Sequence, residues 1–411
     1  MALLLRLGTA LYHAGIKLAA PFMPKARAWV DGRRGLWERL EARAAALEGC
    51  LWVHCASVGE FEQARPVLET IKQARPELPI LLTFFSPSGH TARKEYPLAT
   101  HVEYLPADTA ANASRLVALV RPRMAVFIKY EFWYQHLQAL KRAQVPTYLV
   151  SAIFRRSQPF FQWYGSAHRS MLRFFDRLFV QDEGSRELLA GIGISNVTVS
   201  GDTRFDRVMD IVQQDPDLLL AAAFRSSAQG PVIVAGSTWP DDERLLGETL
   251  SSFTELRAII VPHELGESKL NTTASLFPGP LIRWTDEADP AGARTLLVDQ
   301  MGQLSKLYKY ADITYVGGGF KSGIHNTLEA AAWGRPVIFG PNYDRFAEAH
   351  GLIAAGAGFS VRTTAELRDV LDRLLKEPDA LHKASEAAAR YVRERTGATQ
   401  RVTGVLLPQL R

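Results

Sequence analysis

The chain has 411 residues, of which 47% are hydrophobic and 22% are charged. This is the composition of a globular protein long enough for two domains, and it excludes a disordered, fibrous or disulfide-stapled chain. The net charge of +5 belongs to residues 1–45, where eight basic side chains stand against three acidic ones. The rest of the chain carries 40 of each sign, so its body is neutral and no nucleic-acid partner is expected.

The N-terminal stretch is apolar but is interrupted by Arg6, His13 and Lys17. It contains no run of about 18 uncharged apolar residues, so we expect no transmembrane helix. The internal charges and the lack of a cleavage site also argue against a secretory signal. The three polar residues share one helical face, with leucines largely on the others, which is typical of a helix lying in a membrane interface. The alternative is a helix packed on the protein's own body with a solvated basic face.

The two cysteines, Cys50 and Cys55, lie five residues apart in a predicted strand. They therefore point to opposite faces and cannot form a disulfide with each other. The absence of a disulfide framework is what a reducing compartment predicts.

Strand and helix patterns alternate along most of the chain. Strands are expected at 51–54, 79–85, 102–105, 124–130, 147–152, 178–181 and 197–200, and again at 232–235, 258–261, 281–284, 295–298, 313–316 and 358–361. Such alternation predicts an α/β protein with two doubly wound, Rossmann-like parallel sheets. The carboxyl ends of both sheets would face a shared cleft, where ligands of such sheets bind.

The rhythm also predicts the domain boundaries. We expect residues 1–45 to form a membrane-associating basic arm, 46–210 an N-terminal Rossmann-like domain, 211–230 a linker, 231–378 a C-terminal Rossmann-like domain, and 379–411 a helical segment packing back on the N-terminal domain.

The loop after the first strand contains Ser57, Gly59 and Glu60 and leads into a helix. The N-terminus of that helix favours the ionised form of Glu60, and an ionised carboxylate there could take a proton from an acceptor hydroxyl. The alternative is an acid that only complements the helix dipole.

The second series of loops is rich in hydrogen-bond donors. Ser237 and Thr238 follow one strand, His263 follows the next, and Gly317–Gly319 precede a helix opening near Asn326. Together they could hold an anion such as a phosphate. The alternative is that the glycines form a turn that needs small residues.

Glu329 lies three residues after Asn326, so both project near one face of the helix start. A carboxylate beside an amide suits recognition of vicinal hydroxyls on a sugar, whereas the plainer alternative is a helix cap and its box partner. The ten histidines show no H-E-x-x-H or clustered ligand spacing, so no metal site is predicted.

These residues, taken together, resemble the bacterial 3-deoxy-D-manno-octulosonic acid (Kdo) transferases. The similarity is carried by Met23-Pro24-Lys25, Gly32-Arg33-Arg34, Ser57-Val58-Gly59-Glu60, Thr83 to Gly89, Glu131-Phe132-Trp133, Gly201 to Asp206, Gly236-Ser237-Thr238, His325-Asn326-Thr327-Leu328-Glu329 and Gly334 to Pro341. Members of this family are membrane-associated glycosyltransferases with two Rossmann-like domains (GT-B). They add Kdo from CMP-Kdo to a lipid A precursor.

The resemblance implies a role for each of these residues. Glu60 would be the general base, Ser237, Thr238, His263, Gly318, Asn326 and Glu329 would bind the donor, and Ser57, Gly59, Ser86 and Glu131 would lie on the acceptor side. It implies no bound metal or other cofactor. It also implies peripheral or monotopic attachment to anionic lipids on the cytoplasmic side of the inner membrane.

The chain departs from the family pattern at three places. It reads Ser322-Gly323-Ile324-His325-Asn326 where many members read Gly-Gly-His-Asn, Leu328-Glu329-Ala330 where they read Leu-Glu-Pro, and Pro262-His263 without the usual arginine between. Another basic residue is therefore expected to contact the donor.

Two other functions fit the same architecture, because a fold does not settle the reaction. One is a soluble sugar-nucleotide epimerase, or another transferase of the GT-B type, that would not need residues 1–45. The other is a non-catalytic protein of the membrane surface.

Overall fold

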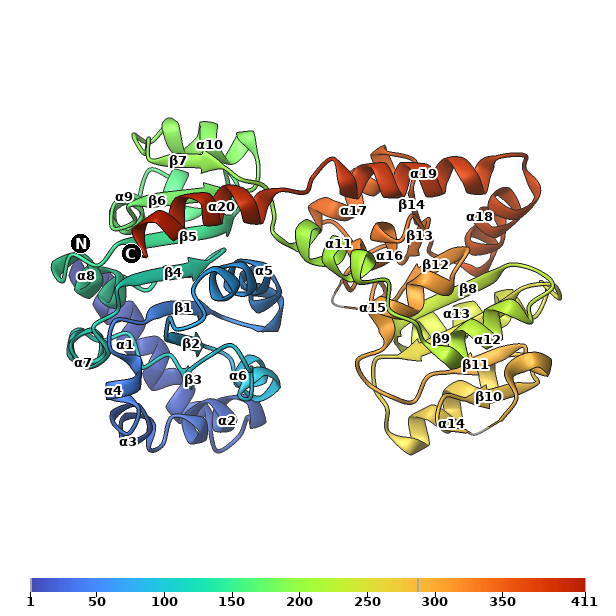
Figure 1. Cartoon of the computed structure of the whole chain (residues 1–411), viewed down its shortest axis with the longest axis horizontal. Coiled ribbons are helices and arrows are strands. Elements are labelled where there is room, and N and C mark those ends of the chain that lie inside the picture. The colour runs from blue at the N-terminus through green and yellow to red at the C-terminus, as the bar shows by residue number, and fades with distance from the viewer. Residues whose placement is uncertain (1, 287, 322, 411) are drawn as a thin grey trace. The chain divides into compact units, whose positions relative to one another are not determined.

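A computed structural model describes residues 2–286, 288–321 and 323–410; the expectation placed on Ser322 lies outside them. The chain divides into two compact units (Figure 1). The N-terminal unit comprises residues 1–207 and 396–411, and the C-terminal unit comprises residues 208–395. Each unit is described by itself below.

The N-terminal unit contains a parallel sheet of seven strands among the described residues, in the order β3-β2-β1-β4-β5-β6-β7. The strands are β1 (Leu51–Cys55), β2 (Ile80–Phe84), β3 (His101–Tyr104), β4 (Met124–Ile128), β5 (Thr147–Ala152), β6 (Arg177–Val180) and β7 (Val197–Val199). The helices are α1 (Ala2–Ala19), α2 (Pro24–Gly32), α3 (Leu36–Glu41), α4 (Ala44–Leu47), α5 (Val58–Ala74), α6 (Pro87–Arg93), α7 (Ala110–Val120), α8 (Tyr134–Arg142), α9 (Ser166–Leu172), α10 (Glu183–Ala190) and α20 (Ala398–Leu406).

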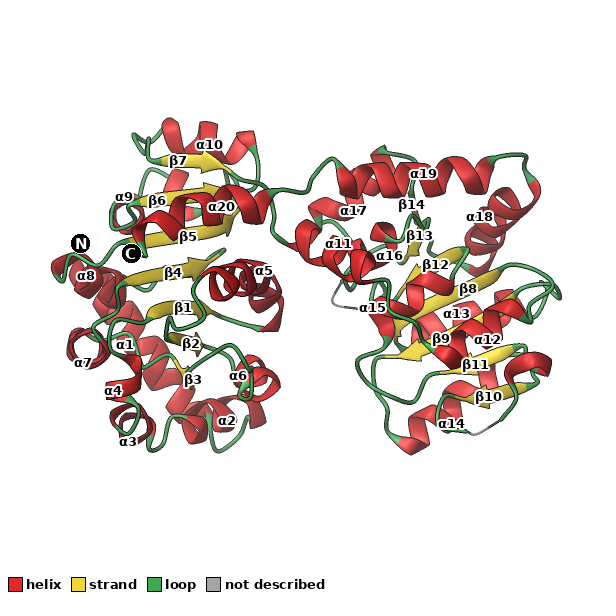
Figure 2. Cartoon of the chain, viewed as in Figure 1, coloured by secondary structure: helices red, strands yellow, loops and turns green. Residues whose placement is uncertain are grey.

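Both faces of this sheet are buried beneath helices (Figure 2), as expected for parallel strands. Side chains alternate along β1, so that Trp52 joins one core and Val53 the other. Cys50 and Cys55 fall in these two separate cores as free thiols, which confirms that they point to opposite faces.

The C-terminal unit repeats the architecture, with seven described parallel strands in the order β10-β11-β9-β8-β12-β13-β14. The strands are β8 (Val232–Thr238), β9 (Arg257–Pro262), β10 (Leu281–Arg283), β11 (Thr295–Leu297), β12 (Ile313–Val316), β13 (Val337–Phe339) and β14 (Gly358–Ser360). The helices are α12 (Leu219–Ser226), α13 (Pro240–Leu250), α14 (Glu267–Leu276), α15 (Leu304–Leu307), α16 (Leu328–Ala332), α17 (Ala347–Ala354), α18 (Thr364–Lys376) and α19 (Ala380–Arg393), while α11 (Arg204–Gln214) spans the boundary between the units.

The strand order reverses at the same place in both sheets, between β1 and β4 and between β8 and β12. Loops at the carboxyl ends of such neighbouring strands diverge and leave room for a ligand. Glu60, in the first turn of α5, and Glu131, in a loop, follow β1 and β4, while Thr238 is the last residue of β8 and Gly318 follows β12. The predicted two-sheet α/β class is confirmed.

The predicted division of the last residues differs from the structure. Helix α19 packs on α16, α17 and α18 within the C-terminal unit, because its small and apolar face (Ala384, Ala387, Ala388, Tyr391, Val392) is buried there. Only α20 returns to the N-terminal unit, where Val402 and Leu406 pack in the core beside α5. Within the expected linker, α12 buries Ala221 and Phe224 in the C-terminal unit.

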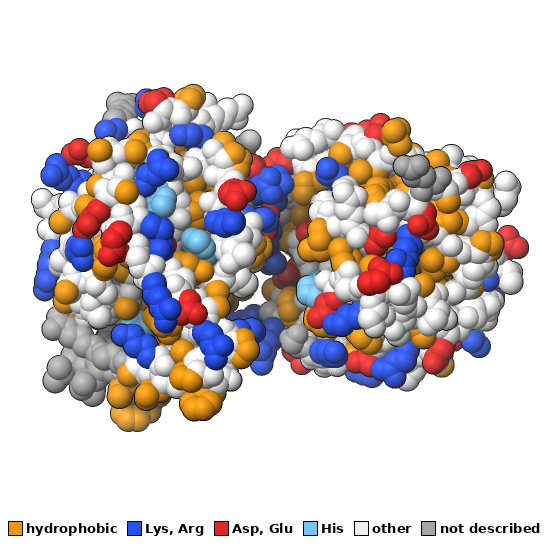
Figure 3. Space-filling model, turned by 90° about the horizontal axis from the view of Figure 1, so that it is seen from below, with side chains coloured by type: hydrophobic (Ala, Val, Ile, Leu, Met, Phe, Trp, Pro, Cys, Tyr) orange, Lys and Arg blue, Asp and Glu red, His pale blue; other side chains and the backbone are white. Residues whose placement is uncertain are grey.

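Helix α1 contacts the body through His13, one of the three residues of the face that was predicted to be polar. His13 is buried and stacks on Trp29 of α2, with ring centroids 5.5 Å apart, whereas Lys17 of the same face is exposed. Leu18 is 76% exposed, and Phe22, just after the helix, is 85% exposed. Figure 3 shows hydrophobic side chains gathered at one edge of the N-terminal unit, beside Lys and Arg.

Two of the arm's arginines serve the fold. The guanidinium of Arg33 lies 3.8 Å from the ring centroid of Trp29 and donates to the carbonyl oxygens of Phe85 and Leu105, both at 3.0 Å. Burial lowers its pKa to about 9. Arg39 forms an ion pair with the buried Glu103. Within the described parts of the chain, no helix combines the length and apolarity needed to cross a membrane.

Candidate active site

Glu60 lies in the first turn of α5, three residues after the N-cap Ser57. Its Oε2 accepts hydrogen bonds from the backbone N–H of Ser57 at 2.9 Å and from the Ser57 hydroxyl at 3.3 Å. The N-terminus of α5 thus carries a capping box, a local device that the Ser-x-x-Glu spacing encodes.

The helix N-terminus favours the ionised form of Glu60 as expected, but larger effects oppose it. Burial and the nearby carboxylate of Glu131 raise the pKa of Glu60 to about 7, against the opposing effects of the Ser57 N–H and of Lys129. The dipole argument considered only the helix, whereas burial and Glu131 act from outside it. A carboxyl group with a pKa near neutrality is well matched to accepting a proton at physiological pH.

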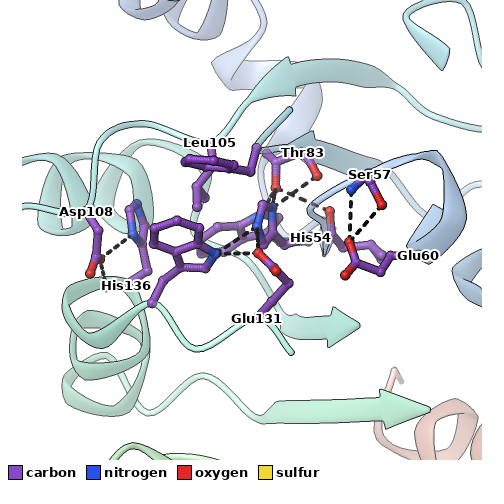
Figure 4. A network of polar contacts seen from close by, with 12 residues as sticks. His54, Ser57, Glu60, Thr83, Leu105, Asp108, Glu131 and His136 are labelled. Carbon is purple, nitrogen blue, oxygen red and sulfur yellow. Dashed lines mark hydrogen bonds and ion pairs between the residues drawn. The ribbon is translucent and has the colours of Figure 1, made fainter. Parts of the chain in front are cut away.

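Glu131 is buried at the end of the loop that follows β4. Its Oε2 lies 2.8 Å from Nε2 of His54 and accepts a hydrogen bond of 2.6 Å from Nε1 of Trp133. Figure 4 shows His54 between Thr83 and Glu131, with Ser57 and Glu60 to one side. The contribution of His54 was not predicted, because His54 is 77 residues away from Glu131 in the chain.

The fold explains Ser86 as a helix cap, but packing does not explain the glycine at position 59. Ser86 is the N-cap of α6 and accepts from the backbone N–H of Gly89 at 3.1 Å. A Cβ placed on Gly59 would meet no atom closer than the Ser57 hydroxyl at 3.9 Å. Packing therefore does not require glycine at position 59, which is compatible with a need for space beside Glu60.

In the C-terminal unit, Ser237 and Thr238 lie where β8 ends. Ser237 has a φ of 52°, a left-handed conformation that is uncommon for a residue other than glycine. Thr238 is buried, and its hydroxyl donates to Glu243 at 3.0 Å. That hydroxyl is thus already engaged inside the unit.

The glycine run after β12 also has a structural explanation. A Cβ at Gly317 would lie 2.3 Å from the carbonyl oxygen of Ser237, and one at Gly318, where φ is 94°, would lie 2.6 Å from that of Gly323. The N–H of Gly318 donates to the buried Asp242 at 2.9 Å. The N–H of Gly318 was expected to help hold a bound anion, but it donates to a carboxylate of the protein itself.

Three rings stack at this edge of the second sheet. His263 lies between Trp239 and His325, with ring centroids 4.5 Å and 4.7 Å away, and Trp239 donates from Nε1 to Nε2 of His325 at 3.0 Å. Burial, together with His263, lowers the pKa of His325 to about 4, so its ring is neutral at physiological pH. Nζ of Lys321 lies 5.0 Å from the centroid of Trp239. Neither Trp239 nor Lys321 was predicted.

Asn326 and Glu329 are brought together as predicted. The Asn326 amide donates to Oε1 of Glu329 at 3.0 Å, and its carbonyl oxygen accepts from the N–H of Leu328 at 3.1 Å. Helix α16 begins at Leu328, two residues later than expected. The predicted donor-binding residues all belong to the C-terminal unit: Ser237, Thr238, His263, Gly318, Asn326 and Glu329. The predicted catalytic and acceptor-side residues all belong to the N-terminal unit: Ser57, Gly59, Glu60, Ser86 and Glu131.

Among the described residues, no group of three or more His, Cys, Asp or Glu side chains is placed to hold a metal ion. The N-terminal unit presents a buried carboxyl pair, and the C-terminal unit, taken by itself, presents stacked rings, an amide and a carboxylate.

Comparison with known proteins gives consistent results. Residues 31–207 match the family model for 3-deoxy-D-manno-octulosonic-acid transferase (kdotransferase). The chain is 28% identical to the 3-deoxy-D-manno-octulosonic acid transferase of Bordetella pertussis, over 92% of this chain and 94% of that protein. It is 29% identical to the Aquifex aeolicus protein of the same name, over 84% of this chain and 92% of the relative.

Among solved structures, the UDP-GlcNAc 2-epimerase from Neisseria meningitidis bound to UDP-GlcNAc aligns with a TM-score of 0.63. It is 16% identical and covers 87% of this chain and 99% of its own, a likeness that bears on the fold alone. Fold and relatives together define a glycosyltransferase of the GT-B type, with two Rossmann-like domains. Within that class, the chain is similar to the 3-deoxy-D-manno-octulosonic acid (Kdo) transferases over most of its length.

Proposed function

We propose that this enzyme transfers Kdo from CMP-Kdo to a lipid A precursor of the lipid IVA type, in the synthesis of the lipopolysaccharide core. The observation that carries the proposal is Glu60, a carboxyl group with a pKa of about 7 in the first turn of α5. It is the group best suited to activate a sugar hydroxyl at neutral pH.

In the proposed reaction, Glu60 takes the proton of an acceptor hydroxyl. The hydroxyl oxygen forms a bond to the anomeric carbon of Kdo as the bond from that carbon to the CMP phosphate breaks. CMP leaves with the electron pair of the broken bond, and the proton stays on Glu60 until it passes to water. Ser57 holds the Glu60 carboxylate through its N–H and hydroxyl, while Gly59 leaves space for the acceptor.

We assign the donor to the C-terminal unit. Asn326 and Glu329 form a fixed pair of polar groups suited to sugar hydroxyls, and Ser237, Thr238, His263 and Gly318 line the adjoining strand ends. In the family pattern an arginine precedes the histidine equivalent to His263. We place Lys321 in its role, because its ammonium group lies against Trp239 in the same stack.

We further propose that the protein attaches peripherally to the cytoplasmic face of the inner membrane through residues 11–27. Leu11, Leu18, Phe22 and Met23 are each more than half exposed. Lys17, Lys25 and Arg27 lie among them and would favour anionic headgroups, each by about 1 kcal/mol. Such an attachment would bring the enzyme to an acceptor that is itself a lipid.

The deciding experiment incubates the purified full-length protein with CMP-Kdo and lipid IVA in mixed micelles, and measures CMP release together with the mass of the lipid product. Wild type should release CMP only when the lipid is present, with a matching gain of Kdo on the lipid. Glu60→Gln should lower the rate by at least about a hundredfold. Equal rates in the two proteins would refute the assignment of Glu60, and no lipid product from wild type would refute the function.

A further inference from the structure

His54 lies in the middle of β1 and is fully buried between the two carboxyl-bearing loops and β2. Its Nδ1 lies 3.1 Å from the backbone carbonyl oxygen of Thr83 and 2.9 Å from the Thr83 hydroxyl. A carboxylate oxygen only accepts, so Nε2 carries the ring hydrogen and donates it to Glu131, while Nδ1 accepts from the Thr83 hydroxyl. This contact fixes the ring and directs Nε2 at the carboxylate of Glu131, 2.8 Å away.

Trp133 approaches the same carboxylate from the loop after β4. Its indole N–H is 2.6 Å from Oε2 of Glu131 and 3.0 Å from Nε2 of His54. The indole ring is held in turn by Phe85, with ring centroids 4.9 Å apart, and the backbone of Phe85 is held by Arg33. Two ring N–H groups therefore converge on one buried carboxylate oxygen and hold it in place.

Both ring nitrogens contact Glu131, the carboxylate whose charge acts on Glu60. We propose that His54 and Trp133 are positioning residues that hold the carboxylate of Glu131 beside the catalytic carboxyl group of Glu60. This inference rests on the proposed role of Glu60 in transfer.

Several other charged or polar groups lie near Glu60 or influence the pKa of its carboxyl group. Lys129 and Tyr130 come from the same loop as Glu131, and the Ser57 N–H comes from its own helix. Glu62, two residues further along α5, forms an ion pair with Arg93 of α6 at 2.8 Å. Lys129 opposes Glu131, and the raised pKa of Glu60 shows that burial and Glu131 prevail.

The test uses Trp133→Phe, which removes the indole N–H but keeps a ring against Phe85, and His54→Leu, which removes the imidazole. Without these donors the carboxylate of Glu131 should no longer be held in place beside Glu60, and its repulsion of the Glu60 carboxylate should weaken. The titration of Glu60 should then move from about 7 by about one pH unit toward acid. The acid limb of kcat/KM should move with it, whereas a merely structural defect would lower the rate without moving the limb.

The titration itself is read from infrared difference spectra of each variant against the same variant carrying Glu60→Gln. Trp52→Phe is the matched control, because Nε1 of Trp52 donates in the same buried layer, at 2.8 Å, to the Thr83 hydroxyl and not to Glu131. His54→Gln keeps an amide donor and should therefore shift the titration of Glu60 less than His54→Leu does.

An unmoved Glu60 titration in both Trp133→Phe and His54→Leu, or an equal shift in Trp52→Phe, would overturn the inference. The spectra do not depend on turnover. If Glu60→Gln retains full transferase activity while the titration still shifts, the proposed function fails and the positioning role of His54 and Trp133 stands.

Discussion

Arg39 donates two hydrogen bonds to the carboxylate of Glu103, from Nε at 2.7 Å and from Nη2 at 2.8 Å. Arg39 belongs to α3 of the basic arm, and Glu103 lies in β3 at the edge of the first sheet. The Glu103 side chain is only 1% exposed. This two-point contact therefore joins the arm to the body through a buried charge.

Replacing Arg39 should destabilise the protein, because Glu103 would be left buried without its partner. We expect Arg39→Gln to lower the free energy of unfolding by about 3 kcal/mol, measured by urea denaturation. Arg34→Gln is the matched control: Arg34 is 77% exposed, pairs with Asp31 on the surface, and should cost no more than about 0.5 kcal/mol. Equal effects of the two substitutions would contradict the structural role of Arg39.

The same pair predicts how stability depends on pH. Burial disfavours the ionised Glu103, but the hydrogen bonds from Arg39 and from the N–H of Tyr104 outweigh it and lower its pKa to about 2. A folded pKa below the unfolded value of about 4.3 stabilises the protein fully above that value, and the stabilisation is lost as the pH falls toward 2. Denaturation curves between pH 3 and 6 should show this acid loss in wild type and a smaller one in Arg39→Gln.

For Glu60, ionisation has the opposite effect on the stability of the fold. Its folded pKa of about 7 lies above the unfolded value, so its ionisation opposes folding increasingly from about pH 4.3 to 7. Glu60→Gln should therefore raise the melting temperature at pH 8, by about 2–4 °C for each kcal/mol relieved, while it abolishes transfer. A lower melting temperature at pH 8 would show that the capping contacts of Glu60 outweigh the cost of its charge.

Wild-type activity should fall below neutrality, because a general base must be deprotonated. We expect kcat/KM to rise about tenfold per pH unit below pH 7 and to level off above it. The pH profile should be measured at a saturating lipid-to-detergent ratio, so that interfacial binding does not limit the rate. A flat profile from pH 5 to 8 would contradict a base with this pKa.

The ring stack makes Trp239 a test of the donor site. Trp239→Leu removes the stack on His263 and the hydrogen bond to His325, and should weaken binding of CMP about tenfold, or about 1.4 kcal/mol, by isothermal titration calorimetry. Trp284→Leu is the matched control, since Trp284 follows β10, two strands away from β9 in the same sheet. Comparable losses in both variants would place CMP away from the stack.

The exposed apolar residues at the end of α1 can be tested separately from catalysis. Leu18→Ser combined with Phe22→Ser should lower binding to vesicles that contain anionic phospholipid by at least about tenfold, measured by co-sedimentation. Leu219→Ser is the control, because Leu219 is 86% exposed but lies in the C-terminal unit. Undiminished binding of the double variant would move the membrane contact elsewhere.

Much of this fold follows from local patterns. Apolar runs that end in glycine or polar loops located the strands of both sheets to within one to three residues, and Glu60 was correctly placed at the start of a helix. Helix α14 was not predicted, since its sequence from Glu267 to Leu276 is mostly polar and has a weak apolar periodicity.

The contacts that tune the site join residues far apart in the chain. Glu131 meets His54 across 77 residues, and Gly318 meets Asp242 across 76. The sequence motif contained Trp133 beside Glu131, but nothing local shows that its N–H points back at that carboxylate. The raised pKa of Glu60 was not predicted for the same reason. Burial and the charge of Glu131, a residue remote in the chain, outweigh the effect of the helix that carries Glu60.

The return of α20 to the N-terminal unit makes that unit discontinuous in the chain, with the C-terminal unit as one uninterrupted segment between its two parts. A growing polypeptide can therefore complete the second sheet while the first still lacks Val402 and Leu406 of its core. The N-terminal unit, which carries Glu60 and the basic arm, is finished last. On the ribosome, its fold stays incomplete until the whole C-terminal unit has been made.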